Sequence, residues 1–182
     1  MKTPPPKELL RFALADHAFR EADSLAEHIL ATSIPVTSHL YMACVAGVVV
    51  SYVRPFVSAE GLGPLPATMA DFAKTEDEQF FKDAHETLVE ARHKIVAHFD
   101  REHAEAEFKS GKTKIPPGEV TIELQQRGCI IGSTATFLTR GQIERSRRLF
   151  ELQIRRVSEH LGTIGERLFV EHGPSKTFTY TA

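Results

Sequence analysis

Apolar positions recur at intervals of three and four along most of the chain, which is the spacing of one face of an α-helix. The first such stretch runs from Pro6 to Leu30, and the second runs from Pro35 to Val53 and is apolar nearly all round. A helix that is apolar on every side is typical of the most buried member of a bundle. Arg54-Pro55 is expected to end it, because proline cannot continue a helix.

Two further helices are predicted from their periodicity and from the residues that start them. Thr75 and Glu78 have the spacing of a capping box, and the apolar period then continues to about Asp100. Thr139 and Gln142 have the same spacing at the start of a helix that Gly173-Pro174 ends. The stripe of this last helix alternates steps of four and three, which predicts nearly antiparallel packing. Its members are Phe150, Ile154, Val157, Leu161, Ile164 and Leu168.

Between these two helices the period changes to that of a strand. Residues 109–118 are expected to form a loop, Val120, Ile122 and Leu124 alternate with polar residues, and the chain can turn and return through Cys129. We therefore predict an all-α antiparallel bundle of four to five helices with a small β-hairpin inserted before the last long helix. Residues 1–182 form a single domain, with 101–138 as the loop and hairpin insertion and 173–182 as a C-terminal tail.

Composition fits a folded protein of the cytoplasm. Of the 182 residues, 42% are hydrophobic and 25% are charged, with a net charge of −2, so a disordered chain is excluded. No Asp, Glu, Lys or Arg occurs from His28 to Val53, but within that stretch only Leu40 to Val50 is unbroken by strongly polar residues. These 11 residues fall short of the roughly 18 that a spanning helix needs. The first residues lack the apolar segment of a signal peptide. Cys44 and Cys129 have apolar neighbours and are interpreted as reduced core thiols.

Candidate chemistry is concentrated at the end of the third predicted helix. Cleavage of RNA without a metal needs a group that titrates near neutrality and a cation to stabilise the phosphate, and His98 and Arg92 are of these two types. On an ideal helix the two side chains point about 120° apart and are separated by roughly 9 Å of rise. A loosened helix near His98, or a second copy related by a twofold axis, would have to complete the site. No phosphate loop or dinucleotide motif is present in the sequence, and no cofactor is expected.

The segment from Arg92 to Asp100 resembles the signature of HEPN domains. That signature is an arginine followed by Asn, Asp or His and, after a short spacer, a histidine. Arg92, His93 and His98 match it, with five residues between the arginine and the last histidine. The hairpin and the segment Tyr52 to Phe56 also resemble bacterial HEPN-like proteins akin to abortive-infection factors.

This resemblance implies a HEPN-like helical bundle and a function. Many members of the family are metal-independent endoribonucleases of toxin–antitoxin or antiphage systems, and they act as homodimers with the motifs at the interface. His98 would then be the general acid/base, Arg92 would bind the scissile phosphate of RNA, and His93 and Asp100 would support them. An antitoxin protein is the further partner that the resemblance suggests. Asp100 stands where some of these toxins carry a tyrosine that a nucleotidyltransferase modifies, which argues against that control.

Other interpretations of the motif stay open. Other HEPN-like proteins are non-catalytic nucleotide-binding or protein-interaction modules, and a helical scaffold without a site is a third reading. Arg92 and His98 would also suit the dipole at a helix C-terminus, in a purely structural role. A metal cluster of His98, Asp100 and His103 fits no standard spacing, so no metal site is predicted.

Basic residues that could contact RNA lie outside the motif. The candidates are Arg54, Arg145, Arg147 and Arg148. Residues 140–156 hold six arginines and two glutamates, which could follow an RNA backbone or form a solvated face with salt bridges. Residues 71–108 hold 11 acids and 5 bases, and the sequence pI of about 6.5 gives no support for a dedicated nucleic-acid binder.

Overall fold

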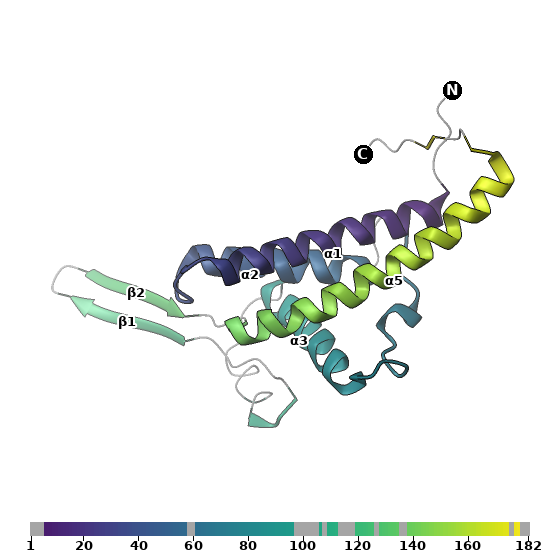
Figure 1. The fold of residues 1–182 in the computed structure, drawn as a ribbon. Helices are drawn as coiled ribbons and strands as arrows, with labels where there is room; N and C mark the ends of the chain where they lie inside the picture. The colour runs from purple at the N-terminus through teal and green to yellow at the C-terminus, as the bar shows by residue number, and fades with distance from the viewer. Residues whose placement is uncertain are drawn as a thin grey trace.

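The protein is a helical bundle in the computed structural model, as the sequence predicts. The structure describes residues 6–57, 61–96, 106, 109–112, 119–125, 128–134, 138–174 and 177–178, without the side chains of 94–96 and of the strands. Four α-helices lie within these ranges: α1 (Lys7–Ala31), α2 (His39–Val53), α3 (Glu78–Val96) and α5 (Arg140–His172). Two short 3₁₀ segments, η1 (Arg54–Phe56) and η2 (Ala67–Ala70), lie between α2 and α3. The long helices α1 and α5 pack along each other, α2 packs on α1, and α3 contacts both α2 and α5 (Figure 1).

Two strands lie where the sequence predicts the hairpin. β1 (Glu119–Gln125) and β2 (Gly128–Thr134) pair antiparallel, from Glu119 opposite Thr134 to Gln125 opposite Gly128. The pair extends away from the helices in Figure 1.

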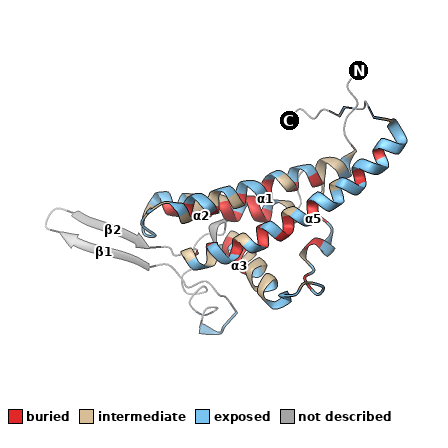
Figure 2. Ribbon diagram, in the orientation of Figure 1, coloured by how far each residue is buried: buried red, intermediate tan, exposed pale blue. Residues whose placement is uncertain are grey.

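The core fills the space between α1, α2 and α5. Phe19 of α1, Tyr52 of α2 and Phe150 of α5 are its largest fully buried side chains, and the three rings lie within one aromatic cluster. Figure 2 shows the buried positions along the inward faces of these helices. Ala22 and Ala26 of α1 are fully buried, and their small side chains allow the neighbouring helices to approach.

The expectation that α2 is buried on every side is wrong. One side packs on the bundle, but Leu40 and Val50 on the other are 60% and 37% exposed, and Val36, just before the helix, is 51% exposed. The reason is position, because α2 packs on α1 and α3 at the edge of the bundle. The span His39–Phe56 also meets a length and hydropathy criterion for a membrane helix, a criterion that core helices of soluble proteins meet as well, and 39% of it is buried inside the protein.

Two predicted helix starts have different outcomes. The capping box at Thr139 is confirmed: its hydroxyl accepts from the Gln142 amide (3.2 Å) and the Gln142 side chain accepts from the Thr139 amide (2.8 Å). The box at Thr75 is wrong, because α3 begins at Glu78 and the Thr75 hydroxyl donates to the carbonyl of Phe72 (2.7 Å). Phe72 is buried, and its carbonyl accepts hydrogen bonds from both the amide and the hydroxyl of Thr75, so Thr75 belongs to a turn that precedes the helix.

Candidate functional site

The described part of the motif lies in the last two turns of α3. Arg92 is half-buried and His93 is exposed, while Leu88 and Ala91 beside them are fully buried in the core. His98 and Asp100 lie outside the described residues, so their place beside Arg92 stays a prediction.

Helix geometry separates Arg92 from the arginines of α5. Arg92 follows His85 by seven residues and shares its face of α3, which is the face that meets Tyr52 of α2. Thr87, about 140° away around the helix, lines a cavity of about 250 Å³ with Arg145 of α5. The structure therefore brings Arg145 to the α3–α5 side and Arg92 to the α2 side.

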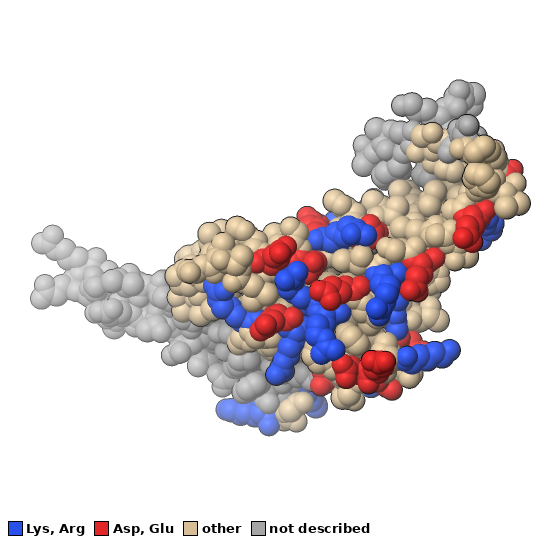
Figure 3. All heavy atoms as spheres, in the orientation of Figure 1, with Lys and Arg blue, Asp and Glu red and all other residues tan. Residues whose placement is uncertain are grey.

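Two of the four candidate RNA-binding arginines have acidic partners. Arg147 binds Asp23 of α1 through two hydrogen bonds (2.8 and 3.4 Å). Arg148 binds Asp77 (2.6 Å) and lies over the ring of Phe80. These contacts give the solvated, salt-bridged face that was the alternative reading of α5, and Figure 3 shows acidic and basic groups interspersed there.

The other two candidates are exposed and lie apart from each other. Arg145 lies in the second turn of α5, beside α3. Arg54 begins η1, and its backbone amide donates to the carbonyl of Val50 and closes α2, where Arg54-Pro55 was expected to end the helix. Its side chain borders a small depression lined also by Arg11 and Leu14 of α1.

Two buried hydrogen-bonded pairs that sequence reasoning missed lie in the core. The hydroxyl of Tyr52 lies 2.7 Å from Nδ1 of His85, and Nε2 of Gln153 donates to the carbonyl of Met69 (2.8 Å). Burial raises the pKa of Tyr52 well above its usual value and lowers the pKa of His85, so both groups are neutral at pH 7. Oε1 of Gln153 is buried and has no hydrogen-bond partner among the described residues. The available signal was the place of Gln153 beside Ile154 and one helical turn after Phe150, on the side of the helix that the apolar stripe predicts to be buried.

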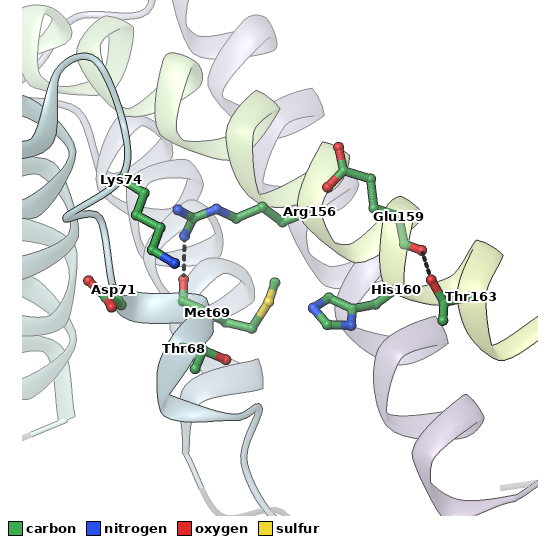
Figure 4. A pocket seen from close by; sticks show the side chains of 8 residues that line it. All are labelled: Thr68, Met69, Asp71, Lys74, Arg156, Glu159, His160 and Thr163. Carbon is green, nitrogen blue, oxygen red and sulfur yellow. Dashed lines mark hydrogen bonds between the residues drawn. The ribbon is translucent and has the colours of Figure 1, made fainter.

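A cavity of about 380 Å³ lies beside Met69, between η2 and α5 (Figure 4). It is lined by Thr68, Met69, Asp71, Lys74, Arg156, Glu159, His160 and Thr163. Arg156 donates to the carbonyl of Met69 (3.2 Å) and lies over the ring of Phe72. Burial lowers the pKa of this guanidinium, and the nearby carboxylate of Asp71 partly opposes that effect.

Within the described ranges, no group of three His, Cys, Asp or Glu side chains is placed to hold a metal ion. Comparison of the chain with family models, with curated proteins and with solved structures finds no match in any of the three. Function must therefore be argued from the residues themselves.

Proposed function

We propose that the protein is a HEPN-type, metal-independent endoribonuclease that acts as a homodimer. The observation that carries the proposal is Arg92 in the last two turns of α3, in a helical bundle, with His98 following it in the sequence after a spacer of five residues. The half-buried Arg92 side chain and the exposed His93 beside it support the proposal, because a phosphate can reach a guanidinium that is not enclosed.

In this proposal the chain's own side chains carry out the cleavage. His98 takes the proton of a ribose 2′-hydroxyl, and the resulting oxygen attacks the adjacent phosphorus. The 5′-oxygen of the next nucleotide leaves and is protonated by the imidazolium of the second copy. The products are a 2′,3′-cyclic phosphate and a 5′-hydroxyl. Arg92 stabilises the charge on the phosphorus oxygens, and His93 and Asp100 orient the reacting groups.

The exposed side of α2 supports the homodimer. Val36, Leu40 and Val50 leave apolar surface in water, and no Asp, Glu, Lys or Arg occurs from His28 to Val53. A second copy related by a twofold axis can cover such a face without burying charge. The proposal extends to a cytoplasmic toxin or antiphage effector, with an antitoxin as a protein partner.

The test is RNA cleavage by the purified full chain with a chelator present. We expect fragments with 2′,3′-cyclic phosphate ends from the wild type, and loss of cleavage by about 100-fold or more in His98→Ala and Arg92→Ala. His17→Ala and Arg20→Ala, both at exposed positions of α1, are matched controls that should cleave like the wild type. Undiminished cleavage by His98→Ala, or dependence on an added metal, would falsify the proposal.

A non-catalytic HEPN-like module that binds a nucleotide or a protein is the second candidate. The observation that favours it is the pairing of Arg147 and Arg148 with Asp23 and Asp77, because paired arginines leave little positive potential for an RNA strand. It predicts no RNA product from any variant, together with saturable binding of a partner that Arg92→Ala weakens.

A further inference from the structure

We propose that the cavity between η2 and α5 is a binding site for a small phosphate monoester of the size of a sugar phosphate or nucleotide. Arg156 and Lys74 would hold its phosphate group. The site does not depend on the proposed nuclease activity. Arg156 lies about 20 Å along α5 from Gln142, the level at which α5 meets Thr87 of α3. Arg92 lies further along α3 from Thr87, away from the Arg156 cavity.

The guanidinium of Arg156 is fixed by a hydrogen bond and makes no ion pair with a carboxylate of the described residues. Its hydrogen bond goes to the carbonyl of Met69, which also accepts from the fully buried Gln153 amide. A guanidinium has five N–H donors, so most of them remain for a ligand. Arg147 is also half-buried, but its charge is matched by Asp23. Burial weakens the hydration of Arg156, and the carboxylates of Asp71 and Glu159 offset this in part without an ion pair, so an anion that enters the cavity would compensate it further.

The other walls fit a phosphate that carries an organic group. Lys74 points from the loop after η2 toward the same space as Arg156, so two positive charges converge there (Figure 4). A doubly charged phosphate is attracted to both groups and can accept two bonds from the planar guanidinium and one from the ammonium group. His160 faces the cavity from α5, and its ring stacks on the buried ring of Phe12. The imidazole ring of His160 therefore offers a flat surface to the rest of the ligand.

Two carboxylates in the lining restrict the ligand further. Asp71 and Glu159 line the same cavity, and Oδ1 of Asp71 accepts from the amide of Ala73 (3.0 Å). These oxygens can accept hydrogen bonds from sugar hydroxyls, but they repel a long polyanion. The volume of about 380 Å³ lies within the range of small-molecule sites and exceeds what a bare phosphate fills. A compact phosphate monoester with hydroxyl groups meets all of these conditions.

Calorimetric titration of the full chain tests the site with four ligands at low salt: ribose 5-phosphate, AMP, inorganic phosphate and adenosine. We expect binding of the two monoesters and no binding of adenosine. Weaker binding of inorganic phosphate assigns the site to monoesters, and equal affinity for it contradicts that assignment. Failure of every phosphate ligand to bind at millimolar concentration, or equal binding of adenosine and AMP, overturns the proposal.

Three variants locate the binding. Lys74→Gln and Arg156→Gln should each weaken monoester binding about 10- to 100-fold, since each removes a charged hydrogen-bond donor. Arg155→Gln, which removes the exposed arginine next in sequence, should bind like the wild type. Lys74 is exposed, so its variant keeps the test valid if loss of the Met69 contact unfolds Arg156→Gln. Unchanged affinity in Lys74→Gln and in a folded Arg156→Gln places the ligand elsewhere and refutes the site.

Discussion

Arg140, the first residue of α5, holds together the end of α1 and the segment that follows it. Its guanidinium donates to the carbonyls of Ile29 (2.7 Å), Thr32 (2.7 Å) and Ile34 (2.9 Å). The carbonyl of Ile29 lies in the last turn of α1, where carbonyls have no helical partner, and Thr32 and Ile34 follow the helix, so a single side chain provides a partner for three carbonyls. Arg140→Met removes all three hydrogen bonds and keeps most of the unbranched stem.

The expected loss of stability is about 3 kcal/mol. A hydrogen bond to a charged group contributes about 1.5 to 3 kcal/mol, and we take about 1 kcal/mol for each because Arg140 is only half-buried and water replaces part of each bond. For a chain of this length, 1 kcal/mol corresponds to about 2–4 °C in Tm, so the melting temperature should fall by about 6–12 °C. Arg140→Lys keeps the charge but cannot span three carbonyls, and it should lose about half as much.

Urea unfolding followed by far-ultraviolet circular dichroism measures these differences. Arg155→Met is the matched control, because this exposed α5 arginine makes no hydrogen bond or ion pair with another described residue, and it should change stability by less than about 0.5 kcal/mol. If Arg140→Met unfolds within about 0.5 kcal/mol of the wild type, water satisfies the three carbonyls equally well and the reasoning is wrong. An equal loss in both variants would indicate a general effect of charge.

Buried groups of the core give three further tests by urea unfolding. Because burial lowers the pKa of His85, the unfolded chain binds a proton there first as the pH falls below about 6.5. The stability advantage of the wild type over His85→Gln should therefore shrink between pH 7.5 and pH 5.5, and a constant difference contradicts this. Phe19→Ala empties a fully buried site beside Tyr52 and should cost about 3–5 kcal/mol; a cost below about 1 kcal/mol would mean that the core refills. Gln153→Met removes an unpartnered buried oxygen along with the bond to Met69, and we expect a change below about 1 kcal/mol, whereas a loss above about 2 kcal/mol would reveal a bond to that oxygen.

Local patterns predicted the long helices well. The predicted range Pro6 to Leu30 became Lys7–Ala31, and the helix predicted after Thr139 became Arg140–His172. Both depend on neighbours in sequence: the apolar period, the box at Thr139, and Gly173, whose φ of 76° favours glycine at a helix end.

Starts that depend on competing turns were predicted less well. Helix α2 begins at His39 instead of Pro35, because the Ser38 amide first closes a turn on the Pro35 carbonyl and the Ser38 hydroxyl then caps the helix. Helix α3 begins at Glu78 and not directly after Thr75, because Thr75 is bonded to the buried Phe72 in a turn. The burial of Phe72 depends on tertiary packing, which a local capping pattern does not contain.

The candidate sites divide in the same way. The motif of Arg92 and His98 was predicted from the sequence, by residue types, spacing and a resemblance, because its residues lie in one short segment. The cavity around Arg156 and Lys74 could not be predicted, because these residues stand 82 positions apart in the chain and only packing of η2 on α5 makes them neighbours.

By itself, then, the order of residues determined which segments are helical and which carry reactive groups, because hydrophobic period and helix capping act within a few residues. Only the tertiary structure decided which charges are free. Arg147 and Asp23 lie far apart in sequence and pair across α5 and α1, whereas Arg156 meets a carbonyl in place of a carboxylate. Such partners are selected when helices pack, since electrostatic and hydrogen-bonding contacts depend on distance in space and not along the chain.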